Sequence, residues 1–238
     1  MSRGGAREQA APWPRRDSFH LRPTIVGGLP SRLNKTSGGG HQEVIQRIIV
    51  RGYRLFRDFE MEPNAGLNIV VGGNEAGKST LLEAISLALT GRVNGRRAEE
   101  ELNPFWFNQD MVAEYFAAIA AGESPAPPEI LVELYLDDTT PDVQMLRAVY
   151  NSRAQDAPGV SVRIMPSPDY AQEFAAYIQA QHRPDILPVE YYEVVWKDFS
   201  GAPIQRRPKG LGVSFIDART IRRVGAWTTT LAKCWATS

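Results

Sequence analysis

The sequence has very few of the residues that build disulfides and metal centres. Its 238 residues include one cysteine, Cys234, which excludes an intrachain disulfide framework and a multi-cysteine zinc site. The three histidines, at positions 20, 41 and 182, are too scattered to indicate a histidine-built metal centre. No apolar run in the sequence approaches the roughly 20 residues that a membrane span requires. We therefore expect a cytoplasmic protein with no membrane partner.

The sequence also lacks an excess of charge of either sign. Lys and Arg number 27 and Asp and Glu number 27, so no overall positive field points to nucleic acid or to an anionic membrane. Any contact with DNA has to be local. The 43% hydrophobic and 23% charged content is ordinary for a soluble globular chain, and the length allows one large domain or two small ones.

Both ends of the sequence differ in texture from its middle. Residues 1–43 are rich in glycine and proline and show no sustained periodicity, so we predict a disordered N-terminal extension. A start codon assigned too far upstream would give the same pattern. Residues 227–238 hold two of the five tryptophans and the single cysteine, and they fit no family pattern. We interpret them as the non-native tail of a frameshifted or truncated gene, which leaves 44–226 as the folded region.

The folded region alternates between strand-like and helix-like patterns. Period-two or continuous apolar spacing predicts strands, and apolar residues three and four apart predict helices. The predicted strands are two within 44–61 that join near Arg57, then 67–71, 130–136, 160–165, 189–196 and 213–216. The predicted helices are 79–90, 108–121, 143–150 and 170–181.

One stretch matches the phosphate-loop pattern G-x-x-x-x-G-K-[ST]. Glycines at both ends let backbone N–H groups turn inward, and a helix N-terminus behind them favours an anion. Lys78 would bring its charge to the β- and γ-phosphates, Ser79 would ligate Mg²⁺, and Thr80 would bond an α-phosphate oxygen. The stretch consists of Gly72, Gly73, Asn74, Glu75, Ala76, Gly77, Lys78, Ser79 and Thr80.

The context of this pattern strengthens it. The bare pattern is expected by chance in about one per cent of chains of this length. Here the apolar run 67–71 precedes it and the amphipathic stretch 79–90 follows it, which is the strand, loop and helix order that a phosphate loop requires. The sequence therefore predicts a site for ATP with Mg²⁺.

The same region resembles a known class of ATPases. Residues 48–56 and 67–85, which include the run Asn-Glu-Ala-Gly-Lys-Ser-Thr-Leu-Leu-Glu-Ala-Ile, resemble the opening of SMC/RecF-type ATPases of the ABC class. Residues 187–199 and 215–219 are similar to the corresponding stretch of OLD-family ATP-dependent endonucleases. The resemblance covers roughly 44–226. It implies an incomplete α/β P-loop NTPase head of the ABC/SMC type, with a mixed sheet flanked by helices.

The resemblance carries further expectations. It implies that Lys78 is catalytic, that ATP and Mg²⁺ are the cofactors, and that two heads form a homodimer with ATP between them. DNA is a partner of the full-length family, whose nuclease lies in a C-terminal Toprim domain, and DNA repair or phage defence is the implied pathway. Arg54 matches an arginine of the family's opening motif and either approaches the nucleotide or is an exposed strand arginine.

Some parts of a hydrolytic site are missing from the sequence. Hydrolysis needs an acidic metal ligand at the end of an apolar strand and an acidic group to position water. The stretch 130–138 imitates such a strand, but its alternation predicts a half-exposed strand that carries Glu133. The stretch 213–217 ends in Asp217 with no second acid, and no Ser-Gly-Gly-type signature follows. We therefore predict impaired hydrolysis.

Two other functions remain open at this stage. One is a non-catalytic nucleotide-binding or dimerisation fragment. The other is a stand-alone nucleotide kinase or GTPase, although the Asn-Lys-x-Asp motif of GTPases is missing. A set of basic residues either contacts DNA phosphates or belongs to a solvated surface. These residues are Arg206, Arg207, Lys209, Arg219, Arg222 and Arg223.

Overall fold

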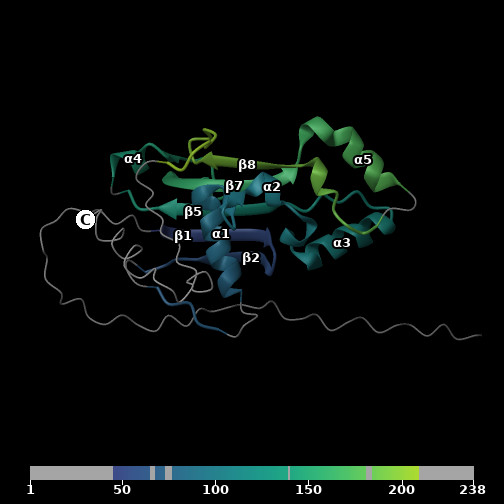
Figure 1. The fold of residues 1–238 in the computed structure, drawn as a ribbon, viewed down its shortest axis with the longest axis horizontal. Helices are drawn as coiled ribbons and strands as arrows, with labels where there is room; N and C mark the ends of the chain where they lie inside the picture. The colour runs from purple at the N-terminus through teal and green to yellow at the C-terminus, as the bar shows by residue number, and fades with distance from the viewer. Residues whose placement is uncertain (1–44, 65–67, 73–76, 139, 181–183, 209–238) are drawn as a thin grey trace, which may run out of the picture.

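The computed structural model describes residues 45–64, 68–72, 77–138, 140–180 and 184–208. The described part is an α/β structure whose main sheet has six strands, and α1 (Lys78–Thr90) runs across β1, β5 and β7 (Figure 1). The strands in the order β2-β1-β5-β7-β6 are neighbours, β8 also pairs with β7, and every pair is antiparallel. The α/β class with flanking helices, as expected for a P-loop ATPase fragment, is thereby confirmed.

The elements follow the chain in a simple order. The main-sheet strands are β1 (Ile45–Tyr53), β2 (Phe56–Met61), β5 (Ile130–Leu136), β6 (Arg147–Ala148), β7 (Ala157–Pro166) and β8 (Tyr192–Asp198), and a small hairpin contains β3 (Arg92–Val93) and β4 (Arg96–Arg97). The other helices are α2 (Ala98–Glu101), α3 (Gln109–Ala120), α4 (Pro141–Gln144) and α5 (Ala171–Gln179), with 3₁₀ turns η1 (Pro104–Trp106), η2 (Pro168–Tyr170) and η3 (Val189–Tyr191).

The main core lies between α1 and one face of the sheet. Because side chains alternate across a strand, every second residue of β1, β5 and β7 points to the same face and contributes to this core. Helix α1 buries three leucines and two alanines against it, and the small alanines allow the helix to lie close to the strands. The buried residues include Ile48, Val50, Leu81, Ala84, Leu87, Ala88, Val132, Leu134, Val160 and Val162.

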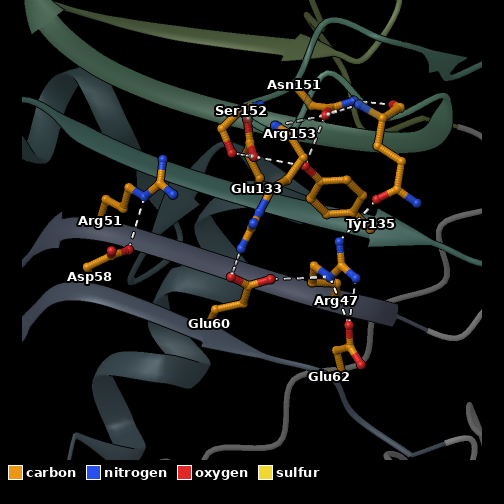
Figure 2. A network of polar contacts seen from close by, with 11 residues as sticks. Arg47, Arg51, Asp58, Glu60, Glu62, Glu133, Tyr135, Asn151, Ser152 and Arg153 are labelled. Atoms are coloured by element: carbon orange, nitrogen blue, oxygen red, sulfur yellow. Dashed lines mark hydrogen bonds and ion pairs between the residues drawn. The ribbon is translucent and has the colours of Figure 1, made fainter. Parts of the chain in front are cut away.

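The opposite face of the sheet carries a polar network beside a second, smaller apolar cluster, and residues 149–156 partly cover it. Glu133 of β5 is only 2% exposed on this face. Its carboxylate accepts hydrogen bonds from the Ser152 backbone N–H at 2.8 Å, the Ser152 hydroxyl at 2.6 Å and the Tyr135 hydroxyl at 3.3 Å (Figure 2). All seven residues of β5 are buried, so the prediction of a half-exposed strand was wrong. The alternating side chains do point to opposite faces as expected, but residues 149–156 also bury the face that carries Glu133.

Salt bridges extend this polar face toward the edge of the sheet. Arg47 of β1 lies 2.6 Å from the Glu62 carboxylate and 3.4 Å from the Glu60 carboxylate, and Arg153 also pairs with Glu60 (Figure 2). Burial is the main cause that raises the pKa of Tyr135, to about 12, and the nearby Glu133 charge adds to it. The network therefore joins β1 and β2 to the segment that covers β5.

The predicted central strand 67–71 is not confirmed. Residues 68–72 have no regular secondary structure, and Ile69 and Val71 are 58% and 49% exposed. Among the described residues, no strand pairs with this segment. A strand exists only where a neighbour takes up its backbone hydrogen bonds, so an apolar run alone does not produce one. Among the residues that the structure describes, the main sheet is therefore antiparallel, and the expected mixed pairing is not found there.

Two smaller predictions were also wrong. The β1–β2 turn lies at Arg54 and Leu55, not near Arg57, because Arg54 takes a left-handed conformation with a φ of 50°. The predicted helix 143–150 ends after one turn at α4, and the chain then enters β6. Leu146 and Val143 are buried, but the short β6 pairs with β7 instead of continuing the helix. The strand at 213–216 lies outside the described residues.

Candidate nucleotide site

The structure describes five residues of the phosphate-loop motif. Gly72 precedes the loop, and Gly77, Lys78, Ser79 and Thr80 carry the chain from the loop into α1. The other four predicted residues, Gly73, Asn74, Glu75 and Ala76, lie outside the described residues. The geometry described below is therefore that of the residues on either side of this gap, Gly72 and Gly77 to Thr80.

Gly77 is required by its backbone conformation and by its neighbour. Its φ of 77° is left-handed, a region that side-chain-bearing residues rarely adopt. A Cβ at this position would lie 3.0 Å from the Phe56 ring. Phe56 in turn stacks at 4.5 Å between ring centroids against Phe59 of the same strand. The left-handed backbone of Gly77 and its contact with Phe56 of β2 therefore both require glycine at this position.

Helix α1 begins directly after Gly77. The Leu81 backbone N–H donates to the Gly77 carbonyl at 2.8 Å, and the first turn contains no acidic residue. The partial positive charge of the helix N-terminus is therefore not offset by a carboxylate within the first turn. Lys78 adds a full positive charge, and its Nζ donates to the Gly72 carbonyl at 2.5 Å. These groups favour an anion beside an exposed Ser79.

Arg54 lies at the turn before β2 and is held by both its backbone and its side chain. Its N–H donates to the Trp106 carbonyl at 2.7 Å, and its carbonyl accepts from the Asn108 amide at 2.8 Å. Its guanidinium pairs with Glu83 of α1 at 2.7 Å. Arg54 is therefore not an exposed strand arginine, since it is half-buried in a turn and bound to the helix that follows the phosphate loop.

Glu83 of α1 binds two neighbouring residues, Tyr53 at the end of β1 and Arg54 in the turn that follows. Its carboxylate accepts from the Tyr53 hydroxyl as well as from Arg54. Burial of the Tyr53 ring, and then its hydrogen bond to Glu83, raise the pKa of this phenol far above its usual value. Tyr53 therefore remains a hydrogen-bond donor across the physiological pH range.

The sequence interpretation assigned no role to Tyr53 or Glu83. One signal was available: Ser79 and Glu83 are four residues apart in a predicted helix and therefore share a face. The contact from this face to Arg54 depends on the turn at the end of β1, which the sequence prediction placed elsewhere.

The acidic groups of β5 and of the two residues after it bind partners away from the phosphate-loop end of α1. Glu133 lies on the sheet face opposite α1, because its neighbours Val132 and Leu134 belong to the core with α1. Asp137 bonds Gln46 and Asp138 pairs with Arg147 at 2.5 Å. Within the described residues, no group of three or more His, Cys, Asp and Glu side chains could hold a metal ion. The second imitation strand, 213–217, lies outside the described residues.

One surface hollow of the described part lies away from the phosphate-loop end. It has a volume of about 250 Å³ and lies on the polar face of the sheet, where Glu133, Ser152, Arg163 and Lys197 contribute to its lining. No helix among the described residues is long and apolar enough to pass through a membrane.

Comparison with known proteins supports the assignment of the phosphate loop and of α1. An AAA domain family matches residues 47–117. The DNA replication and repair protein RecF of Thioalkalivibrio sulfidiphilus is 36% identical over 97 residues, which are 41% of this chain and 26% of that protein. The DNA double-strand break repair Rad50 ATPase of Methanopyrus kandleri is 45% identical over 49 residues, 21% of this chain and 6% of that protein.

The family match extends from β1 through β2, the phosphate loop, α1 and α2 into α3. The chain spans about a quarter of the RecF relative's length and much less of the Rad50 relative's. The agreement between the family match and the local geometry applies to residues 47–117. Residues 47–117 therefore match an AAA domain, and the chain is similar over part of its length to RecF and Rad50 proteins.

Proposed function

We propose that this chain binds ATP with Mg²⁺ at its phosphate loop, as the nucleotide-binding segment of a DNA-repair-type ATPase. The observation that carries the proposal is the start of α1: a left-handed Gly77, followed by Lys78 and Ser79 at a helix N-terminus without a first-turn acid. This arrangement presents positive charge and a hydroxyl on one side of the loop. Such a site suits a polyphosphate with its metal ion.

Each residue of the motif has a specific role in this proposal. Lys78 exchanges its bond to the Gly72 carbonyl for the β- and γ-phosphates, and Ser79 ligates Mg²⁺. Thr80 bonds an α-phosphate oxygen. Gly73, Asn74, Glu75 and Ala76 supply backbone N–H groups to the phosphates. Mg²⁺ supplies charge neutralisation between the phosphate oxygens when it is bound.

We further propose that the whole protein is an OLD-like endonuclease or a related ATPase that acts on DNA as a homodimer. The names of the RecF and Rad50 relatives, which refer to DNA replication and repair, support the DNA partner. The similarity of residues 187–199 to OLD-family enzymes supports the nuclease assignment. Phage defence is the alternative pathway within the same proposal.

Hydrolysis by this chain alone is expected to be slow. Glu133 is the one carboxylate inside the apolar strand β5. It does not face α1 and the phosphate loop, because it accepts hydrogen bonds from Ser152 and Tyr135 on the opposite face of the sheet. This observation favours a second candidate function, a nucleotide-binding or dimerisation segment without catalysis of its own.

The proposal is tested by titrating the chain with ATP in the presence of Mg²⁺ and in the presence of EDTA. We expect saturable binding that Mg²⁺ strengthens, and we expect Ser79→Ala to remove the Mg²⁺ effect of about tenfold. Ser86→Ala, on the same helix two turns further along, is the matched control and should bind as the wild type does. Mg²⁺ dependence that survives in Ser79→Ala would contradict the assigned metal ligand.

A phosphate-release assay on the same samples separates the two candidate functions. Binding with negligible turnover favours the non-catalytic segment. Efficient turnover by this chain alone would contradict the prediction of impaired hydrolysis.

A further inference from the structure

Arg54 has a rigid backbone and a side chain with spare donors. Its left-handed φ of 50° is costly for a residue with a Cβ, and such strain persists only where the surroundings enforce it. The Trp106 carbonyl and the Asn108 amide enforce it by binding the Arg54 N–H and carbonyl. Asn108 is itself fixed, because its N–H donates to the Gly52 carbonyl at 2.8 Å. The origin of the side chain is therefore fixed relative to β1.

The tip of the Arg54 side chain is held by the Glu83 carboxylate and lies over the Tyr53 ring, 5.6 Å from its centroid. A guanidinium has five N–H donors, and Glu83 binds Nη2. The Arg54 Nε is buried and has no hydrogen-bond partner among the described residues. The protein encloses this Nε, but the Arg54 side chain as a whole is 36% exposed, so its other N–H donors have the capacity to bind a further anion.

Glu83 places this guanidinium close to the proposed phosphate site. Residues four apart in a helix share a face, so the Glu83 carboxylate lies on the same side of α1 as the Ser79 hydroxyl, about 6 Å further along the axis. Tyr53 anchors the carboxylate from the β1 side. Glu83 and Arg54 are 23% and 36% exposed, so the pair is shielded from solvent more than a surface ion pair is.

We propose that Glu83 is a positioning residue for nucleotide binding, which acts by holding the Arg54 guanidinium one helical turn from Ser79. The donors that Glu83 leaves unused then bind the phosphates of ATP, while Tyr53 keeps the carboxylate in place. Glu83 also offsets the charge of Arg54 beside Lys78 until the nucleotide arrives. This inference rests on the proposed ATP site and adds two residues, Glu83 and Tyr53, that do not contact the ligand.

The test is a double-mutant cycle measured by ATP titration with Mg²⁺. Glu83→Gln keeps the size of the side chain and removes its charge, and we expect it to weaken ATP binding about tenfold. In an Arg54→Ala background the same substitution should change the affinity less than about twofold, because Glu83 acts through Arg54. A purely structural role would weaken binding equally in both backgrounds and would overturn the proposal.

A matched control and a second variant complete the test. Glu114→Gln breaks another Arg–Glu pair, Arg57–Glu114, on the surface, and should leave the affinity unchanged. If Glu83→Gln does not fold, Tyr53→Phe replaces it, since it removes only the hydroxyl that anchors Glu83. Its expected loss of about threefold in affinity should also vanish in the Arg54→Ala background, and a loss that persists there would overturn the proposal.

The inference and the ATP site can fail separately. If Lys78→Ala abolishes binding while Glu83→Gln binds as the wild type does, only the role of Glu83 is overturned. If the wild type and Lys78→Ala bind ATP equally, the ATP site is overturned and the inference with it.

Discussion

The two ends of α1 are built for different tasks. At its N-terminal end, Gly77 has no side-chain cap, and Lys78 and Ser79 bring charge and a hydroxyl to the loop. At its C-terminal end, the left-handed Gly91 donates to the Leu87 carbonyl at 2.8 Å, and the Trp196 indole N–H donates to the Ala88 carbonyl at 2.8 Å. The carbonyls of the C-terminal end are bound by protein groups, whereas the N-terminal end is the proposed binding site for a phosphate ligand.

This difference indicates how the helix serves both the fold and the site. Trp196 of β8 lies against Gly91, so the last turn of α1 is fixed to the far side of the sheet from β2. The first turn can then be specialised for phosphate without loss of the fold. We therefore expect substitutions at the C-terminal end to change stability and substitutions at the N-terminal end to change affinity.

The largest effect on stability is expected from Gly91→Ala. Gly91 has a φ of 64°, and an added Cβ would lie 2.8 Å from the Trp196 ring. The backbone strain and the clash together should lower the free energy of unfolding by about 3 kcal/mol, measured by urea denaturation. ATP affinity of the folded fraction should not change.

Gly95→Ala is the matched control for this substitution. Gly95 has a φ of 83°, but a Cβ there would have nothing within 4 Å. Gly95→Ala should therefore lower the free energy of unfolding only by the cost of the backbone strain, about 1 kcal/mol. Equal losses for Gly91 and Gly95 would contradict the role of the Trp196 contact.

A smaller effect is expected from Trp196→Phe. The substitution removes the indole N–H that binds the Ala88 carbonyl in the last turn of α1, and phenylalanine fills most of the same space. The free energy of unfolding should fall by about 1 to 2 kcal/mol, and ATP affinity should stay constant. A loss of affinity larger than the loss of stability would show that the two ends of α1 are not independent.

The smallest effect is expected from Glu114→Gln, at neither end of α1. Its side chain is exposed, and the hydrogen bond from Arg57 lowers the pKa of Glu114. A lowered carboxylate pKa stabilises the fold above the unfolded pKa, and this contribution disappears as the pH falls through the folded value. Urea denaturation at neutral pH should show a loss below about 0.5 kcal/mol, and at acidic pH the variant and the wild type should coincide. A loss above about 1 kcal/mol would contradict a solvent-screened pair.

Elements with strong local patterns could be predicted from the sequence. The helix at 79–90 was predicted within one residue of α1, and Asn108 was expected at the start of α3, where its side chain caps the Met111 N–H. The strand 130–136 matches β5. These elements have apolar spacing and end signals that depend only on nearby residues.

Features that depend on distant neighbours could not be predicted. The run 67–71 has a strand composition, but a strand also needs a partner, which the local sequence does not specify. The contact of Arg54 with Glu83 depends on how β1 meets α1. By contrast, the β3–β4 hairpin carried a local signal, the Asn94–Gly95 pair at its turn, that the sequence interpretation overlooked.

The central claim is that the N-terminal end of α1 binds the phosphates of ATP through Lys78 and is not needed for the fold. The most direct test is calorimetric titration of Mg²⁺·ATP into the wild type and Lys78→Ala, with urea denaturation of both. We expect Lys78→Ala to lose at least about 100-fold in affinity while its free energy of unfolding stays within about 0.5 kcal/mol of the wild type. Equal affinity of the two proteins would contradict the claim.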